Sequence, residues 1–325
     1  MSNVALTLAC ADYGRVMPLA TGEVVPDGID LTLRLGAGGS WPRRAELIAA
    51  GLSDPSLAGG EASIGAHLRR VDQGDESFVA LPIFPLRGFA GRDIYVRKDG
   101  PVKTAADLIG RPFGLYSWFA SGSVWYREFL RYAGVPLDSL TWWVGDIERP
   151  GETSHAGALP DGVTRAPEGR FLAQMLIDGE IDGMFSPPRP VAYDPENGPI
   201  VRLFPDMRAI DKAYYRDRGV YPPLHLVAIR RAVFDANPWV AKSLTEAFTA
   251  ANAAFMASQR GFPYASPWME AELDETVALM GEDFHPQGFE ANRAAIDIFC
   301  EEAFRAGLSS RRLTPEALFA DYLAL

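Results

Sequence analysis

The feature that most constrains the fold is a regular alternation of short apolar stretches with amphipathic ones. Apolar and β-branched residues predict strands over residues 4–9, 29–35, 78–84, 93–97, 111–115, 140–144, 181–185, 201–205 and 224–229. Helical spacing predicts helices over residues 43–51, 123–133 and 170–178, and an almost entirely helical chain from Pro238 onward. Strands that alternate with helices predict an α/β sheet protein, to which the C-terminal helices are an addition.

Length and charge narrow the range of functions. A chain of 325 residues fits about two domains, and small-molecule sites concentrate in clefts between domains. The net charge of −11 argues against a nucleic-acid partner, because no basic face is available to displace counterions from phosphates. A small anion responds to a few local arginines instead, so this composition is compatible with an anionic ligand.

The two cysteines and the lengths of the apolar stretches indicate the cellular compartment in which the protein is expected. Cys10 and Cys300 are isolated in the sequence, which argues against a disulfide framework and against a structural zinc site. The N-terminal stretch lacks the basic and long apolar regions of a signal peptide, and no stretch approaches the ~20 apolar residues of a membrane span. We therefore expect a cytoplasmic protein without a membrane partner; a homo-oligomer is one open alternative for its assembly.

Seven segments resemble one known family. They are CADYGR (10–15), FVALPIFPLRGF (78–89), IYVRKDG (94–100), LHLVAIRR (224–231), NPWVAKSLTEAF (237–248), MGEDFHPQGFEANR (280–293) and LSSRRLTPEALF (308–319). Their order and spacing resemble the 4,5-dihydroxyphthalate decarboxylase family over nearly the whole chain. The resemblance implies a two-lobe α/β fold similar to type 2 periplasmic binding proteins, with a ligand cleft between the lobes.

The resemblance also implies how the chain divides. Lobe I is expected to combine residues 1–96 and 204–325, including the helical C-terminal extension, and lobe II to span residues 97–203. The two crossovers between the lobes are expected near residues 95–97 and 202–204.

The activity implied by the resemblance removes one carboxylate from a dihydroxylated phthalate. A phenol para to the departing carboxylate pushes electron density onto the ring carbon that bears it. Protonation of that carbon gives a dienone-like intermediate, from which CO2 leaves. Such a site needs cations for the retained carboxylate, an acid near the ring carbon and a dry pocket. No cofactor is required.

Two arginines follow predicted strands, where ligands bind in open α/β sheets. Arg15 is a candidate carboxylate clamp, with Asp12 fixing its position and Tyr13 beside it; the alternative is a surface turn with a local ion pair. Arg87 lies in a proline-bounded loop and has the planar fork that suits a carboxylate, although a solvated loop arginine is equally compatible.

The second half of the candidate site centres on His225. It lies in an alternating strand, at a position where the family pattern also carries histidine, and is the candidate proton donor; the alternative is a satisfied core histidine. Glu61 and Ser63 match a Glu and a Ser of the family, and His67 could face the same cleft. A divalent metal at Glu61, His67 and His225 is a weaker alternative, because no ligand spacing supports it.

Lobe II offers a further set of candidates. Ser121 and Ser123 precede or open a helix, where free N–H groups bind anions, although serine is also a common helix cap. Ser186 and Arg189 belong to the proline-braced stretch DGMFSPPRP after a predicted strand and are expected to face the cleft. The aromatic candidates for stacking on a substrate ring are Trp118, Phe119 and Trp125, with core packing as the alternative, which is favoured for Trp125. Tyr116 is a further substrate-binding candidate.

Residues 36–67 depart most from the family pattern, because SDPSLAGGEASIGAHLRR is glycine-rich and lengthened. The fold therefore transfers more safely than the substrate. Three functions remain in competition: a cofactor-independent aromatic carboxy-lyase, a binding or sensor protein for a small carboxylate, and an enzyme that acts on another carbon skeleton. The first is favoured.

Overall fold

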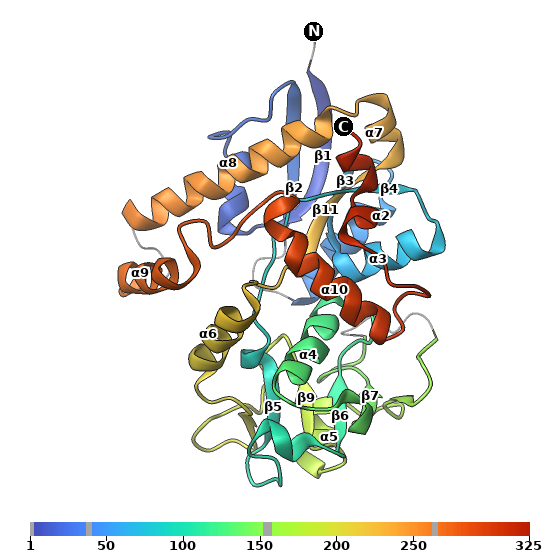
Figure 1. Cartoon of the computed structure of the whole chain (residues 1–325), viewed down its shortest axis with the longest axis vertical. Helices are drawn as coiled ribbons and strands as arrows, with labels where there is room; N and C mark the ends of the chain where they lie inside the picture. The colour runs from blue at the N-terminus through green and yellow to red at the C-terminus, as the bar shows by residue number, and fades with distance from the viewer. Residues whose placement is uncertain (1–2, 37–40, 152–157, 262–265) are drawn as a thin grey trace. The chain divides into compact units, whose positions relative to one another are not determined.

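The computed structural model describes residues 3–36, 41–151, 158–261 and 266–325. The chain forms two compact units (Figure 1). Unit 1 comprises Met1–Gly88, Val220–Phe304 and Ser309–Leu325, and unit 2 comprises Phe89–Gly219 and Arg305–Leu308. Within the described ranges, every helix is too short or too polar to traverse a lipid bilayer.

The strands of unit 1 are β1 (Val4–Ala11), β2 (Ile29–Gly36), β3 (Gly59–Ser63), β4 (Phe78–Leu81) and β11 (His225–Arg230). They form one sheet in the order β2-β1-β3-β11-β4. Both β2 and β3 run parallel to β1, whereas β11 runs antiparallel to β3 and β4. The strand β11 thus enters the sheet beside β3, although the two are far apart in the sequence.

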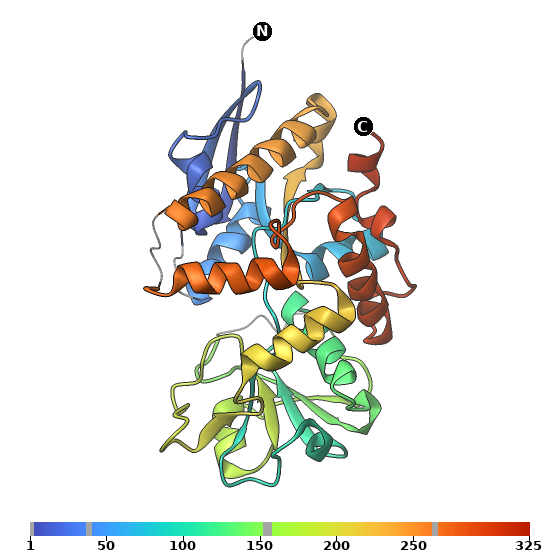
Figure 2. The same ribbon diagram turned by 60° about the vertical axis from the view of Figure 1, so that its left-hand side comes forward.

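Helices cover both faces of this sheet. The helices of unit 1 are α1 (Met17–Ala20), α2 (Trp41–Ser53), α3 (Ile64–Gln73), α7 (Arg231–Ala236), α8 (Val240–Gly261), α9 (Met269–Met280), α10 (Arg293–Arg305), α11 (Pro315–Leu318) and α12 (Ala320–Leu323). Figures 1 and 2 show α8 along one face, where Leu6, Leu8 and Cys10 share its apolar cluster. Ala9 and Ala11, which alternate with these residues along β1, belong instead to a cluster with Leu47 of α2 on the other face. Burial on both faces explains why β1 is apolar throughout.

Unit 2 has a sheet in the order β10-β5-β9-β6-β7-β8. Its strands are β5 (Ile94–Arg97), β6 (Pro112–Leu115), β7 (Thr141–Val144), β8 (Val163–Arg165), β9 (Gly183–Phe185) and β10 (Ile200–Arg202), and its helices are α4 (Ser121–Tyr132), α5 (Leu172–Asp178) and α6 (Met207–Arg218). Short 3-10 helices occupy Gly14–Val16, Gly91–Asp93, Ala105–Leu108, Leu137–Ser139 and Glu290–Asn292. The apolar face of α5 packs on this sheet through Leu172, Met175 and Leu176.

The segments predicted to cross between the lobes form β5 and β10. These strands are antiparallel neighbours, with Tyr95 opposite Arg202 and Arg97 opposite Ile200. Both lie inside unit 2, whose first boundary falls between Gly88 and Phe89 and whose second falls between Gly219 and Val220.

Candidate active site

A buried carboxylate, Glu61, lies at the centre of the unit 1 sheet. Its strand, β3, is inserted between β1 and β11. A Cβ atom at Gly60 would lie 2.3 Å from the carbonyl oxygen of Ala9, and one at Gly59 would lie 2.1 Å from that of Ala228. Gly59 also has a φ of 147°, which disfavours other residues. Two glycines therefore let β3 fit between its neighbours and present Glu61.

Four groups contact the carboxylate of Glu61, which is fully buried. The amide N–H of Ala11 donates to Oε2 at 3.0 Å, and the hydroxyl of Tyr13 donates to Oε1 at 2.7 Å. Nδ1 of His225 lies 2.5 Å from Oε1, and Sγ of Cys10 lies 3.8 Å from Oε2. Burial alone would raise the pKa of Glu61, but the bonds from His225, Ala11 and Tyr13 hold it below its ordinary value. Glu61 is therefore a carboxylate.

His225 is the first residue of β11 and lies opposite Ser63 in the sheet. Because the Glu61 carboxylate accepts, Nδ1 of His225 carries a proton and donates it. Nε2 has no hydrogen-bond partner among the described residues, and the side chain keeps 16% of its surface exposed. The carboxylate thus orients the imidazole through Nδ1 and leaves Nε2 available to another partner.

The same carboxylate perturbs two neighbouring groups. Burial, followed by the charge of Glu61, raises the pKa of the Cys10 thiol well above its usual value. The same two causes raise the pKa of the Tyr13 phenol. Cys10 therefore stays a thiol rather than a thiolate nucleophile, and Tyr13 stays a hydroxyl donor to Glu61.

Two arginines lie next to this group, on or beside the loop that follows β4. Nη1 of Arg15 donates to the carbonyl oxygen of Pro85 at 3.3 Å. Arg87 donates to the Tyr221 carbonyl at 2.8 Å, to the Pro286 carbonyl at 2.5 Å and to the Asn292 side chain. Within the described chain, the Nε atoms of both arginines are buried and meet no acceptor.

Burial lowers the pKa of both guanidinium groups, that of Arg87 to about 9. The charge of Arg15 also contributes to the lowered pKa of Arg87, so the two guanidinium groups repel each other. A buried guanidinium with an unused N–H is suited to binding an anion. Arg15 gives one hydrogen bond to the residues that the structure describes, so it has the larger unused donor capacity of the two.

The proposed partnership of Asp12 with Arg15 is a correction. Asp12 is exposed, and in the described part of the chain it forms no ion pair with Arg15. Arg15 instead takes its position from the Pro85 carbonyl. Ser63 caps α3 by accepting from the amide of Ala66 at 3.4 Å, so its hydroxyl serves a local structural role.

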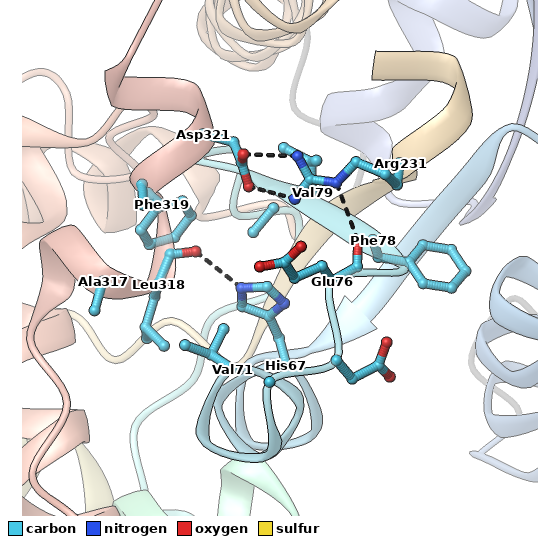
Figure 3. Close-up of a pocket in the computed structure, with 14 residues that line it drawn as sticks. His67, Val71, Glu76, Phe78, Val79, Arg231, Ala317, Leu318, Phe319 and Asp321 are labelled. Atoms are coloured by element: carbon cyan, nitrogen blue, oxygen red, sulfur yellow. Dashed lines mark hydrogen bonds and ion pairs between the residues drawn. The ribbon is translucent and has the colours of Figure 1, made fainter. Parts of the chain in front are cut away.

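His67 lies in a different part of unit 1. Its Nε2 donates to the carbonyl oxygen of Leu318 at 2.9 Å, and burial lowers its pKa. It lines a cavity of about 260 Å³ beside the bidentate pair of Arg231 and Asp321, whose bonds are both 2.7 Å (Figure 3). The cavity is lined by residues of α3, β4, α7 and the C-terminal helices, so His67 ties the C-terminal segment to α3.

The weaker alternative of a divalent-metal site needs His67 beside Glu61 and His225. Only the last two lie together. Over the described ranges, no group of three or more His, Cys, Asp and Glu side chains is placed to hold a metal ion.

The lobe II candidates all lie in unit 2, several of them in its core. Trp118 is buried, donates from Nε1 to the Ala306 carbonyl at 2.9 Å and packs under the guanidinium of Arg127 at 4.4 Å. Tyr116 is buried with its ring 6.2 Å from that of Phe185, and Phe119 is half-buried. Trp118 therefore fits the core-packing alternative better than a stacking role.

The polar candidates of unit 2 differ in their surroundings. Ser121 and Ser123 are buried in the first turn of α4, and Oγ of Ser123 meets no partner in the described chain. Oγ of Ser186 donates to the carbonyl of Pro188 at 2.5 Å, so this serine braces its own loop. Arg189 is exposed, with its guanidinium 5.8 Å from the ring centre of Tyr193.

Four residues of the unit 1 group are not among the sequence-predicted site residues: Cys10, Tyr221, His285 and Asn292. No sequence motif indicates Cys10 or Asn292 as site residues. Tyr221 lies four residues before His225 and is not part of a recognisable motif either. His285 belongs to the GEDFHPQG stretch, which resembles the family but has no pattern that marks this histidine as a site residue. Proximity to Arg15 and Arg87 is visible only in three dimensions.

The comparisons with known proteins decide the family. No protein-family model matches the chain. The 4,5-dihydroxyphthalate decarboxylase of Comamonas testosteroni is 31% identical over 326 residues, covering 98% of this chain and 97% of the relative. The chain belongs to the 4,5-dihydroxyphthalate decarboxylase family. The enzyme of the same name from Pseudomonas putida is 30% identical over 220 residues, covering 66% of this chain and 83% of that protein.

Membership in the 4,5-dihydroxyphthalate decarboxylase family confirms the predicted family and the predicted enzyme class, a carboxy-lyase. The periplasmic aliphatic sulphonate binding protein SsuA from Escherichia coli matches with a TM-score of 0.51 and 16% identity, covering 97% of this chain and 92% of that one. This likeness concerns the fold alone. It confirms the predicted two-lobe α/β fold similar to periplasmic binding proteins.

Proposed function

We propose that the chain catalyses the non-oxidative decarboxylation of a hydroxylated, phthalate-like aromatic carboxylic acid. The observation that carries this proposal is the Glu61–His225 pair, in which a buried carboxylate holds a partly exposed imidazole at 2.5 Å. The names of the two curated relatives support the same substrate class.

In this proposal, Nε2 of protonated His225 donates its proton to the ring carbon that bears the departing carboxylate. A ring hydroxyl supplies the electron density for this step, and a dienone-like intermediate forms. The bond to the carboxylate carbon then breaks, its electron pair returns to the ring, and CO2 leaves. His225 regains its proton from solvent, so one proton is consumed and one CO2 is released per turnover.

Glu61 acts on the reaction through His225 and is a positioning residue. Its charge stabilises the imidazolium that must exist before proton transfer, and its hydrogen bond fixes which nitrogen points to the substrate. Arg15 binds the retained carboxylate. The attraction between a cation and a bound anion is stronger in a largely buried site than in water, because the dielectric constant there is lower.

The test is incubation of the purified chain with a panel of benzene carboxylates that includes 4,5-dihydroxyphthalate and unsubstituted phthalate, with and without a chelator. Released CO2 is measured beside binding by calorimetry. We expect CO2 from the dihydroxylated acid and binding without turnover of phthalate, which lacks the hydroxyl that drives the reaction. Tight binding of one acid with no CO2 from any of them would overturn the enzyme proposal and favour a solute-binding or sensor function for a small carboxylate.

A further inference from the structure

Three buried side-chain nitrogen atoms without a hydrogen-bond partner in the described part of the chain belong to neighbouring residues of unit 1. Two are the Nε atoms of Arg15 and Arg87, and the third is Nε2 of His285, which is 1% exposed. Each lacks a hydrogen-bond partner among the residues that the structure describes. A buried donor without an acceptor costs about 1–3 kcal/mol, so a group of three requires an explanation.

The side-chain amide of Gln287 lies beside Nδ1 of His285 and also within reach of the carbonyl oxygens of Phe84 and His285. Oε1 of Gln287 accepts from the backbone amide of Phe84 at 2.6 Å, which identifies the other atom of the side-chain amide as its nitrogen. That nitrogen lies 3.3 Å from Nδ1 of His285 and can only donate. In the tautomer in which Nδ1 accepts from this nitrogen, the ring proton of neutral His285 is on Nε2, and the subsite proposed below uses that tautomer.

His285 is neutral because its surroundings oppose a positive charge. Burial, together with the charges of Arg15 and Arg87, lowers the pKa of His285 to about 2. Both guanidinium groups therefore act electrostatically on the ring of His285. An uncharged N–H donor beside two guanidinium groups adds a hydrogen bond to an anion without adding further repulsion between cations.

The segments that carry these donors are joined to one another. Arg87 donates to the carbonyl of Pro286, the residue after His285, and Arg15 donates to the carbonyl of Pro85 in the same loop as Arg87. The ring of His285 lies 6.0 Å from that of Tyr221, whose carbonyl also accepts from Arg87. These bonds hold the donor groups in place before any ligand binds, which lowers the entropy lost on binding.

We propose that the unused N–H groups of Arg15, Arg87 and His285 form a carboxylate subsite in unit 1, in which His285 is a specificity-determining donor. This inference rests on the proposed function, since it assigns the subsite to the carboxylate that the substrate keeps. Two cations with one neutral donor match a carboxylate, which accepts several hydrogen bonds at two oxygens. A neutral ligand would leave two guanidinium charges buried without compensation.

The experiment compares two amide variants, H285Q and H285N, by calorimetry with phthalate. Glutamine places its amide near the position of Nε2 and can supply the donor, whereas asparagine reaches only the position of Nδ1. We expect H285N to weaken phthalate binding by about 10- to 100-fold, the effect of one lost hydrogen bond to a charged group. H285Q is expected to stay within about 3-fold of the unmodified protein. Dimethyl phthalate, which has the same ring without charge, is not expected to bind.

N252L is the matched structural control. Nδ2 of Asn252 donates to the carbonyl oxygen of His285 at 3.3 Å, so this change disturbs the same buried region but removes none of the three donors. We expect a lower melting temperature with unchanged phthalate affinity. If H285N does not fold, the comparison of phthalate affinity between H285Q and H285F replaces it, with the same expected direction.

The outcomes separate this inference from the proposed function. Phthalate binding that depends on the Nε2 donor, with no CO2 from any hydroxylated acid, supports the subsite and overturns the decarboxylase. Turnover of 4,5-dihydroxyphthalate with equal phthalate affinity in H285N and H285Q overturns the subsite and leaves the decarboxylase standing. No binding of phthalate to the unmodified protein also overturns the subsite.

Discussion

At the scale of single residues, the central feature is a carboxylate whose hydrogen bonds all serve to fix one histidine. Glu61 accepts hydrogen bonds from the amide of Ala11 and the hydroxyl of Tyr13. These bonds hold its Oε1 atom next to Nδ1 of His225. A buried charge is tolerated only when such bonds replace water. The cost of burying Glu61 is thus offset by bonds that also orient the proposed proton donor.

E61Q tests the role of this charge. Glutamine keeps the shape of the side chain but removes the negative charge that stabilises the imidazolium. We expect kcat to fall by about 10²- to 10³-fold, with phthalate affinity within about 3-fold, because Arg15 and Arg87 are unchanged. Steady-state kinetics on 4,5-dihydroxyphthalate and calorimetry with phthalate measure the two effects. Equal losses of affinity and of kcat would contradict a positioning role and indicate general damage to the site.

Y13F gives a graded companion to E61Q. Phenylalanine removes the 2.7 Å hydrogen bond to Oε1 but leaves the charge of Glu61 and its bond to His225. We expect kcat to fall by about 5- to 20-fold, in line with the loss of about 1–2 kcal/mol of orientation. The same kinetic assay measures it. A fall as large as that of E61Q would show that the Tyr13 phenol, rather than the carboxylate, is the more important group.

The sequence identified both members of the central pair but not their contact. Glu61 and His225 are 164 residues apart, and only the antiparallel pairing of β3 with β11 brings them together. His285 could not be assigned from sequence, because its interest lies in an unpartnered Nε2 beside two arginines. Unsatisfied hydrogen bonds are a property of the folded chain and leave no mark in a single sequence.

At the scale of elements, the strand that carries Glu61 was the least predictable part of the fold. The prediction placed strands correctly wherever apolar and β-branched residues cluster, as in β1, β2 and β11. GGEAS, the sequence of β3, has no β-branched residue and two glycines, which normally weaken a strand. Tertiary packing overrides that preference, because β1 and β11 approach too closely for a side chain at either glycine.

G60A tests this account of β3. Its added Cβ would lie 2.3 Å from the backbone oxygen of Ala9, which cannot move without breaking the sheet. We expect the free energy of unfolding to fall by about 2–4 kcal/mol, measured by denaturant titration. In the control G88A, the nearest atom beside the new Cβ is the Leu224 side chain at 3.6 Å, an ordinary contact. Equal effects of the two changes would contradict the account.

At the scale of the whole molecule, one buried and one partly buried carboxyl group of unit 2 make stability depend on pH. Burial raises the pKa of Asp93 to about 7 and that of Asp211 to about 7. Ordinary aspartates in an unfolded chain titrate near 3.9. Between about pH 4 and pH 7 the folded state therefore binds more protons than the unfolded state, so stability falls as the pH rises through this window.

D211N removes one of these titrations and keeps an acceptor for the amide of Gly91, which bonds Oδ1 at 3.3 Å. We expect the free energy of unfolding at pH 8 to rise by about 1–3 kcal/mol over the unmodified protein, with a much smaller difference at pH 4. Denaturant titrations at the two pH values measure it. D161N, at an exposed aspartate of the same unit, is the control and should change neither value. A gain for D211N that is equal at both pH values would contradict burial of a carboxylate as the cause.

The two-lobe fold could be predicted because it rests on features that sequence records well: alternating strands and helices and the order of family segments. The chemistry of the site depends on a few contacts between distant segments. Within unit 1, those contacts gather a carboxylate, an imidazole and two guanidinium groups around the ends of β1, β3, β4 and β11. The fold alone does not specify the function, because one fold can host many functions. The function must therefore be tested by changing the residues of the site.

The most direct test of the central claim, that His225 delivers a proton to the ring carbon, is turnover of 4,5-dihydroxyphthalate in D2O by the unmodified protein and by H225Q. We expect the unmodified protein to release CO2 and to leave one deuteron on the vacated ring carbon, seen by NMR of the product. We expect H225Q to bind phthalate normally but to release CO2 at least about 100-fold more slowly. Full turnover by H225Q, or no CO2 from the unmodified protein, would contradict this claim.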